Sequence, residues 1–390
     1  MAEEFKMPNL PPLERYTFAG SVDVMTPALI IYPELVDANI RETIRLLGGN
    51  PNRWRPHVKT AKLSYVMKRF VDHGITSFKC STTLELLTVC QAGAADVLLA
   101  YPTAGAGARR VRELQSMYPG VRISILVESD TQVRTWADSG VGVFIDVNPG
   151  MDRTGIQQAR TDDIVSLAHK IVTQGSPFLG LHYYDGHISA PDMTERCAQA
   201  KRGYDALLGI VSAIEKQGVP VEEVITAGTP AFPCTMAYPR FTDASFLHRA
   251  SPGTVVYMDC SSLNSLPDEY NYQPAAVVLS TVVSKPTRDI ITCDAGHKTV
   301  SADAGAPTCA AIGKPFLRPI KPSEEHLPMQ VLNAGRAPEI GDNLFLVPRH
   351  ICPTVNNFDY AVIVSHGQVA GLEKVTARGR EAPSGASAIA

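Results

Sequence analysis

The chain has 390 residues, of which 45% are hydrophobic and 19% are charged, and its formal net charge is −3. This is a globular composition with enough chain for a large core and for two domains. The charge gives no basic footprint for nucleic acid or for an anionic membrane, so we expect neither as a partner. No apolar run approaches the roughly 20 residues of a membrane helix, and Met1-Ala2-Glu3-Glu4 carries no signal pattern. The eight cysteines are scattered without a Cys-x-x-Cys pair, which predicts reduced, mostly buried thiols in a cytoplasmic protein.

Strands and helices alternate through the first two thirds of the chain. Residues 1–23 are polar and contain proline, and we predict an N-terminal extension there. An apolar run over 27–32 predicts a strand, and Pro33 opens the amphipathic helix that follows it. Eight further strands are predicted near residues 57, 77, 98, 124, 144, 181, 225 and 256. Helical connections join parallel strands, so we predict an α/β fold with a (β/α)8 TIM barrel over 24–258.

The sequence changes character after Asp259. β-Branched runs over 277–284, 290–293, 343–348 and 360–364 are separated by proline, glycine and asparagine. This pattern predicts a C-terminal all-β domain over 259–380, to which strand 27–32 can be added. The Ser/Ala/Gly-rich residues 381–390 are predicted to be a disordered tail.

Lys59 is the first candidate for chemistry. Val58 is apolar and Pro56 tolerates only a strand start or edge, so residues 55–59 are predicted to form the first barrel strand. Barrel enzymes carry their chemistry at the C-terminal ends of the strands, and a lysine there can form a Schiff base. Clustered lysines and arginines are also typical of a solvated face, which is the alternative interpretation.

Two loops could hold an anion. Thr226-Ala227-Gly228-Thr229 ends the seventh predicted strand, and Pro252-Gly253-Thr254 begins the eighth, which continues to Tyr257. Small residues let backbone N–H groups and hydroxyls close around a phosphate, and barrels commonly use these two loops for it. A plain surface turn is the alternative. Together with Lys59, the loops indicate an anionic, aldehyde-bearing cofactor, and pyridoxal phosphate meets both needs.

His350 and Cys352 are a candidate metal pair. In a strand, residues i and i+2 share a face, so we predict that the two side chains project together. Imidazole and thiolate suit Zn²⁺ better than Mg²⁺, and two protein ligands would leave positions for water and substrate. A buried histidine beside a structural cysteine is the alternative.

Six motifs occur in the order Arg55-Pro56-His57-Val58-Lys59-Thr60, Asp152-Arg153-Thr154-Gly155, Tyr184-Asp185-Gly186-His187, Thr226-Ala227-Gly228-Thr229, Pro252-Gly253-Thr254 and His350-Ile351-Cys352-Pro353-Thr354. In this order they resemble the D-threonine aldolase and D-serine dehydratase family, which is related to alanine racemase. The resemblance extends from about residue 24 to about residue 380, and its lysine and His-x-Cys motifs are the specific ones. It implies an N-terminal pyridoxal-phosphate barrel, a C-terminal β domain and pairing of two subunits, so we expect a homodimer.

The resemblance also implies a role for each site residue. Lys59 would carry pyridoxal 5'-phosphate covalently, Arg153 would contact its ring oxygen, and Tyr184 would line the pocket. The other predicted cofactor-binding residues are Thr226, Gly228, Thr229, Gly253, Thr254 and Tyr257. His350 and Cys352 would bind a divalent metal, Zn or Mn. We interpret His182 as a packed barrel histidine.

Two features favour different reactions. Aldolase members generally present His-x-Asp as the metal pair, whereas dehydratase members present His-x-Cys, as this chain does. His187, however, resembles the aldolase histidine that takes a proton from the substrate hydroxyl. We predict a metal-dependent lyase that cleaves D-threonine-like D-3-hydroxy amino acids to glycine and an aldehyde, with His187 as the general base.

Three alternatives stay open. A D-serine or D-threo-3-hydroxyaspartate dehydratase would eliminate water to give a 2-oxo acid and ammonia, with Lys59 taking the α-proton. A racemase would need a second base facing Lys59, and no motif of the β domain supplies one. A pyridoxal-phosphate-binding protein without catalysis would resemble the barrel alone, so the His-x-Cys motif is evidence against it.

Overall fold

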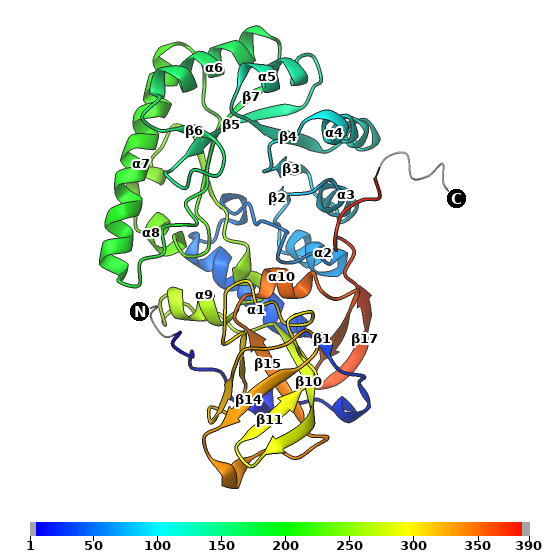
Figure 1. Ribbon diagram of the computed structural model, residues 1–390. Helices are drawn as coiled ribbons and strands as arrows, with labels where there is room; N and C mark the ends of the chain where they lie inside the picture. Colours follow the sequence, from blue (N-terminus) through cyan, green and yellow to red (C-terminus); the bar gives the residue numbers. More distant parts are fainter. Residues whose placement is uncertain (1–4, 384–390) are drawn as a thin grey trace. The chain divides into compact units, whose positions relative to one another are not determined.

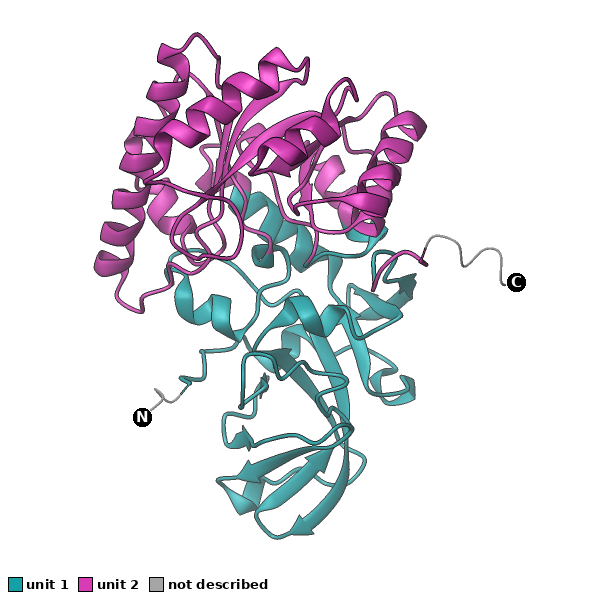
Figure 2. Cartoon of the chain, turned by 45° about the horizontal axis from the view of Figure 1, so that its top comes forward, with its two compact units in different colours: residues 1–43, 60–66, 254–378 teal, residues 44–59, 67–253, 379–390 magenta. Residues whose placement is uncertain are grey.

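The computed structural model describes residues 5–383, which divide into two compact units (Figure 2). Unit 1 comprises residues up to 43, 60–66 and 254–378. Unit 2 comprises 44–59, 67–253 and the residues from 379 on. The units therefore interleave along the chain, whereas the predicted domains followed one another at residue 258. Within the described residues, no helix combines the length and the apolar character needed to cross a bilayer.

Unit 2 contains the parallel strands and most of the long helices. Its strands are β2 (Ser77–Cys80), β3 (Asp96–Leu99), β4 (Arg122–Val127), β5 (Gly142–Asn148), β6 (Ile156–Gln157), β7 (Phe178–Tyr183), β8 (Glu223–Thr226) and β9 (Leu247–Ala250). Its helices are α2 (Ser64–Asp72, whose first residues belong to unit 1), α3 (Thr83–Gln91), α4 (Gly105–Met117), α5 (Asp130–Trp136), α6 (Thr161–Thr173), α7 (Met193–Lys216) and α8 (Phe232–Met236), with short turns η3 (Pro51–Arg53) and η4 (Pro239–Phe241).

These strands form a closed barrel. They pair in the order β2-β3-β4-β5-β7-β8-β9, and every pair is parallel. Trp54 bridges Ala250 of β9 and His57 bridges Lys79 of β2, both in parallel, so residues 54–57 join the two edges. Helices α3 to α7 lie around the outside of the strands (Figure 1). The predicted eight-stranded α/β barrel is therefore confirmed.

The first barrel strand is irregular. The predicted strand 55–59 consists of isolated bridges, held by hydrogen bonds from Arg55 N to Ala250 O (2.9 Å) and from Val58 N to Lys79 O (2.8 Å). Pro56 has no N–H to donate, and its carbonyl accepts from Lys79 N at 2.9 Å. The position of the strand was predicted correctly, but proline interrupts its regular ladder.

The eighth strand was predicted at the wrong place. It is β9, Leu247–Ala250, whereas the start of the predicted strand 254–258 is a 3-10 turn, η5 (Thr254–Val256). His248 and Arg249 made β9 look like a polar loop. His248 instead shares a hydrogen bond with Thr226 (2.8 Å), and Arg249 pairs with Glu223 (2.5 Å). Tertiary partners therefore allow a polar sequence to form a buried strand.

Unit 1 contains the antiparallel sheet. Its strands are β1 (Ala28–Ile31), β10 (Ala276–Thr287), β11 (Ile290–Cys293), β12 (Cys309–Ala311), β13 (Leu317–Pro319), β14 (Leu327–Val331), β15 (Asn343–Pro348), β16 (Tyr360–Ser365) and β17 (Gln368–Lys374). Its helical elements are most of α1 (Pro33–Leu46), α9 (Cys260–Ser265), α10 (Ile351–Val355), η1 (Leu13–Arg15), η2 (Ser21–Asp23), η5 and η6 (Ala334–Arg336).

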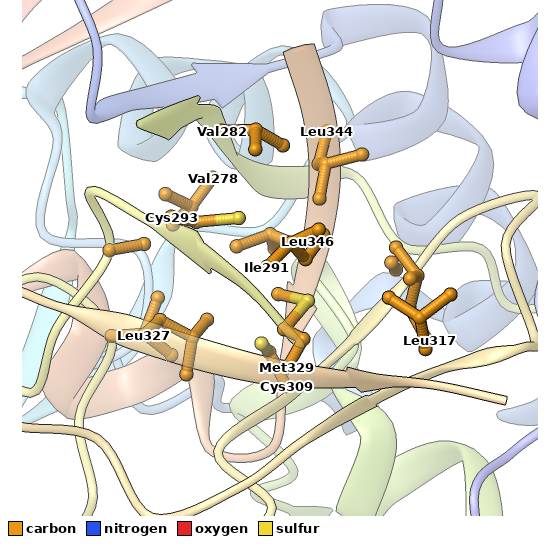
Figure 3. Close-up of a cluster of buried hydrophobic side chains, with 14 residues drawn as sticks. Val278, Val282, Ile291, Cys293, Cys309, Leu317, Leu327, Met329, Leu344 and Leu346 are labelled. Carbon is orange, nitrogen blue, oxygen red and sulfur yellow. The ribbon is translucent and has the colours of Figure 1, made fainter. Parts of the chain in front are cut away.

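Strand β1 is built into this sheet from the far end of the sequence. It pairs antiparallel with β10 and parallel with β16, and this pairing brings the N-terminal residues into unit 1. Side chains of β10, β11, β14 and β15, such as Val278, Ile291, Met329 and Leu344, converge in a buried apolar core (Figure 3). These strands lie at the β-branched runs from which the sequence predicted an all-β region.

Parts of both predicted chain ends are ordered. Tyr16, within the predicted extension 1–23, is fully buried in a second apolar cluster of unit 1. Glu381, within the predicted disordered tail 381–390, pairs with Arg110 on α4 at 2.8 Å. The remainder of that tail, 384–390, lies outside the described residues.

Candidate active site

Three cationic side chains converge on the ring of Tyr184, the residue that follows β7. Lys59 Nζ lies 5.6 Å from the ring centroid, Lys79 Nζ lies 5.4 Å from it, and Arg153 Cζ lies 4.9 Å from it. These distances are within the range of cation–π attraction. Lys59 follows the closing segment of the barrel, and Arg153 follows β5. The structure therefore brings together three predicted site residues, Lys59, Arg153 and Tyr184, at the carboxyl ends of the barrel strands.

A row of hydrogen-bonded side chains connects Lys79 of β2 with His182 of β7 and Asp146 of β5. Lys79 Nζ donates to His182 Nε2 (3.3 Å), and His182 Nδ1 donates to Asp146 Oδ1 (2.7 Å). Thr154 Oγ1 donates to the other oxygen of Asp146 at 2.7 Å. This carboxylate fixes the tautomer of His182 and leaves Nε2 as an acceptor for the lysine. His182 is thus buried, as we predicted, but it also connects Asp146 to Lys79.

Burial and charge shift the pKa values of this row. Burial, followed by the charge of Lys59, lowers the pKa of Lys79 to about 7. Burial, followed by the charge of Lys79, also lowers the pKa of His182. Burial alone would raise the pKa of Asp146, but its contacts with His182 and Thr154 hold it below the ordinary value. At neutral pH the row therefore contains an ionised carboxylate, a neutral imidazole and an amine near its titration point.

Sequence reasoning missed Lys79. Lysine in a short strand resembles a solvent-facing residue, yet only 2% of Lys79 is exposed. Its neighbour Phe78 packs edge-on against Phe70 of α2, with ring centroids 6.0 Å apart, and so faces outward from the barrel. Adjacent residues of a strand face opposite ways, so Lys79 faces inward. That alternation is the signal that could have identified it.

The loop after β8 is hydrogen-bonded to Asp185, which follows β7. Gly228 N donates to Asp185 Oδ1 (2.9 Å), and Tyr204 Oη donates to Asp185 Oδ2 (2.6 Å). Burial raises the pKa of Asp185. Two of the predicted phosphate-binding groups, the Thr226 hydroxyl and the Gly228 N–H, thus already have partners within the barrel. They shape the loop that carries Thr229, and their contact with a phosphate stays a prediction.

Two glycines permit close approaches beside Tyr184 and Lys59. A Cβ on Gly186 would lie 2.3 Å from Tyr184 Oη, and a Cβ on Gly253 would lie 2.7 Å from His57 O. Because neither space admits a side chain, these glycines fix where the loops pass. A depression is lined by Asp146, Arg153 and Tyr184, among others.

His187, the predicted general base, is exposed three residues after Tyr184. Within residues 5–383 its imidazole forms no hydrogen bond or ion pair. This side chain is accessible to a substrate, and its role as a base stays a prediction.

The predicted metal pair lies in unit 1, but not on a strand. Strand β15 ends at Pro348, His350 is the N-cap of α10, and Cys352 lies within that helix. The strand geometry that we predicted is therefore wrong. Pro353, in the first turn of α10, is the signal that could have indicated a helix start. The two side chains nevertheless meet, since His350 is hydrogen-bonded to Cys352.

Neighbouring groups of unit 1 surround this pair. Cys352 Sγ lies 3.0 Å from Thr60 Oγ1 and 3.7 Å from Thr254 Oγ1, and His350 Nδ1 donates to Asp303 Oδ2 at 2.6 Å. Burial would lower the pKa of His350, but Cys352 and Asp303 outweigh it and raise the pKa to about 9. Because Asp303 occupies Nδ1, Nε2 is the nitrogen that could bind a metal.

Two protein ligands are a small set for a metal. Among the residues described, no group of three or more His, Cys, Asp or Glu side chains is arranged to hold a metal ion. The imidazole and thiol, with a carboxylate orienting the imidazole, fit a divalent ion whose other positions are open. Tyr257, predicted to line the cofactor site, is fully buried and donates to Ala61 O at 2.9 Å.

Two family models match successive parts of the chain. The family model described as alanine racemase, N-terminal domain, matches residues 31–261, and that described as putative serine dehydratase domain matches 275–364. The chain is similar to the D-threonine aldolase of Arthrobacter sp., with 26% identity over 91% of this chain and 93% of that protein.

Solved structures show the same fold. The D-threonine aldolase from Filomicrobium marinum has a TM-score of 0.84 and 26% identity, over 92% of this chain and 97% of that one. The D-threo-3-hydroxyaspartate dehydratase from Delftia sp. HT23 has a TM-score of 0.76 and 21% identity, over 93% of this chain and 99% of that one.

Proposed function

The chain belongs to the alanine racemase N-terminal domain family, and from this premise we propose that it is a pyridoxal-phosphate-dependent lyase of D-3-hydroxy amino acids. The observation that carries the proposal is the convergence of Lys59, Arg153 and Tyr184 at the carboxyl ends of the barrel strands. This end of a barrel is where enzymes of the fold carry their chemistry. Aldolases and a dehydratase among its relatives support a lyase.

The residues around Tyr184 fit an anionic aldehyde cofactor. Lys59 offers the amine that would attach to the aldehyde, and Arg153 offers a guanidinium for an oxygen anion. Thr229, Gly253 and Thr254 lie in the two loops for which we propose phosphate binding. Bound there, pyridoxal phosphate would accept the electron pair that develops at the substrate Cα.

Retro-aldol cleavage of D-threonine-like substrates is the reaction that we propose. Both 26%-identical relatives reported above are D-threonine aldolases, whereas the dehydratase is 21% identical. The exposed imidazole of His187 is available to take the proton of the substrate β-hydroxyl, which must leave before Cα–Cβ can break. The products would be glycine and an aldehyde.

β-Elimination is the second candidate, and the metal pair favours it. His350 and Cys352 form the His-x-Cys pair of the dehydratase type, and the putative serine dehydratase domain covers them. In this reaction the Lys59 amine would take the α-proton, and the products would be a 2-oxo acid and ammonia.

We propose that His350 and Cys352 hold a divalent ion, Zn or Mn, and that Asp303 orients His350. Such an ion would act as a Lewis acid toward the substrate hydroxyl. One solved D-threo-3-hydroxyaspartate dehydratase is a cysteine-to-alanine variant in the metal-free form. Removing the carboxylate with Asp303→Asn should weaken metal affinity about 10–100-fold, as for other carboxylates that hydrogen-bond a metal-binding histidine. Competition with a fluorescent chelator would measure it, and unchanged affinity would contradict the role of Asp303.

The products formed from D-threonine, with and without a chelator, test the function. Acetaldehyde and glycine would support aldol cleavage, and His187→Asn should then lower kcat about 10²- to 10⁴-fold. 2-Oxobutyrate and ammonia would support elimination, and His187→Asn should then have little effect. If neither product forms while the cofactor is attached to Lys59, the lyase proposal is wrong for this substrate, and a racemase or a binding protein becomes the better explanation. Activity that persists in the chelator would contradict the metal.

The expected homodimer is a proposal that rests on the family resemblance, and the cytoplasmic location is a proposal that rests on the scattered cysteines. Light scattering of the purified holoenzyme would measure the mass of the assembly.

A further inference from the structure

Lys79 is a buried amine without an ion-pair partner. Lysines are almost never fully buried unless they are paired, yet no carboxylate of residues 5–383 lies within ion-pair distance of Lys79 Nζ. The two nearest acids that influence it, Asp146 and Asp185, direct their oxygens at other donors. Lys79 Nζ donates a hydrogen bond to the neutral Nε2 of His182, at 3.3 Å. The mechanism proposed above gives this amine no task.

Charged groups influence Lys79 from several segments of the barrel. Arg55 and Lys59 come from the segment that closes the barrel, Asp146 comes from β5, and His182 and Asp185 come from β7 and the residue pair after it. Lys59 and Lys79 approach the same ring, at 5.6 and 5.4 Å from its centroid. Two amines that share a buried site repel each other, so the charging of one disfavours the charging of the other.

An anion at this site would reverse that balance. A negative charge beside a buried amine favours the protonated form, and it also screens the repulsion between the two lysines. We propose that Lys79 is a positioning residue that takes up a proton when an anionic cofactor occupies the site of Lys59, and that its new charge holds the anion. His182 stays neutral throughout and accepts from the lysine in both states, because Asp146 fixes its tautomer. This inference rests on the proposed function, since it requires pyridoxal phosphate at Lys59.

The proposal predicts a proton uptake that depends on pH. Lys79, with a pKa of about 7 in the absence of the anion, is mostly neutral at pH 8 and mostly charged at pH 6. Anion binding raises this pKa, so at pH 8 the amine should gain close to one proton, about 0.9 at the most, and at pH 6 it should gain little. The step forms one N–H bond on the amine of Lys79, and the proton comes from the solvent or its buffer.

Calorimetric titration of the apoprotein with pyridoxal phosphate measures the uptake. The apparent binding enthalpy is compared in two buffers of different ionisation enthalpy, at pH 6 and at pH 8. In the wild type, uptake should be larger at pH 8 than at pH 6 by up to about 0.8 proton per chain. Lys79→Met removes the amine and Lys79→Arg keeps a permanent charge, so both variants should lose this difference. Lys62→Met, which replaces another buried lysine, should keep it.

The two variants of Lys79 separate the proton from the charge. If the role of Lys79 is to hold the anion, Lys79→Met should weaken binding at both pH values, whereas Lys79→Arg should retain affinity. A variant that binds the cofactor and takes up as many protons as the wild type overturns the inference. If Lys79→Met does not fold, Lys79→Arg alone decides, because arginine stays charged throughout this pH range.

A second readout distinguishes this inference from the proposed function. Reduction with borohydride fixes a cofactor that is attached to a lysine, and peptide mapping then identifies that lysine. If the reduced cofactor is found on Lys59 while proton uptake is unchanged in both Lys79 variants, only the role of Lys79 is overturned. Absence of fixation on Lys59 overturns the proposed function, and the inference with it.

Discussion

Buried cations have different partners at the two ends of the barrel. At the amino ends of the strands, fully buried Arg55 donates to Asp96 (2.6 Å) and to Glu223 (2.9 Å), and Arg249 also donates to Glu223 (2.5 Å). At the carboxyl ends, buried Lys79 is hydrogen-bonded to the imidazole of His182 and lies over the ring of Tyr184. Arg55 and Arg249 are thus paired directly with carboxylates, whereas among the described residues no carboxylate is paired with Lys79.

We interpret the paired amino end as stabilising the fold and the carboxyl end as the end that binds a ligand. Burial alone would raise the pKa of Asp96, but Arg55 and Arg122 hold it below its ordinary value. Burial alone would lower the pKa of Arg55, but Glu223 and Asp96 raise it. In this network Arg55 and Arg249 each have a carboxylate partner. The Lys79 end is electrostatically incomplete, and an anion would complete it. In barrels, the amino end is generally the stabilising one and the carboxyl end the catalytic one.

The largest expected effect is that of Lys59→Met at the unpaired end. Without the amine, the cofactor has no point of attachment, so product formation from D-3-hydroxy amino acids should fall to the uncatalysed background. The variant should also lack the visible absorbance of the lysine-bound cofactor. Lys62→Met serves as the control. An active Lys59→Met enzyme would contradict the proposed site.

Next in size is the effect of Glu223→Gln at the paired end. The substitution leaves Arg55 and Arg249 buried with one carboxylate fewer, and breaking a buried pair of this kind costs about 3–5 kcal/mol. The free energy of unfolding in urea would measure the loss. The folded fraction should still bind the cofactor, because the change lies at the other end of the barrel. A loss below about 1 kcal/mol would mean that the network is less important for stability than its burial suggests.

Lys79→Met should change how stability depends on pH. The pKa of Lys79 is lowered to about 7 in the folded chain, against about 10.4 in the unfolded chain, so between these values the unfolded chain binds more protons. Wild-type stability should therefore rise with pH in this window, by at most about 1.4 kcal/mol per pH unit from this group. Below pH 7 the apo variant should have a larger free energy of unfolding than the apo wild type. This difference between the two free energies should narrow toward pH 10. A difference that does not vary with pH would show that Lys79 stays charged when folded.

The smallest expected effect is that of Arg122→Gln. Arg122 also donates to Asp96, but 45% of its side chain is exposed, and Arg55 continues to pair with that carboxylate. Exposed ion pairs contribute about 0–1 kcal/mol, so urea unfolding should shift little. A loss as large as that of Glu223→Gln would mean that the exposed arginine is an equal member of the network.

The sequence determined the barrel and the lysine at its mouth. Hydrophobic periodicity and turn residues are local properties, and they predicted seven strand positions of the barrel and the alternating strands of the β domain. The order of motifs predicted the residues that the barrel gathers at Tyr184, namely Lys59 and Arg153.

Tertiary structure decided what happens to polar side chains. Strand β9 is invisible to a hydrophobic pattern because His248 and Arg249 find partners on neighbouring strands. Lys79 resembles a surface lysine in the sequence; strand alternation sets the side of β2 on which it lies, and closure of the barrel buries that side. His350 and Cys352 meet through a helix cap instead of a strand. The physical reason is the same in each case: periodicity records which side chains avoid water, whereas the partners of a buried charge lie far away in the sequence.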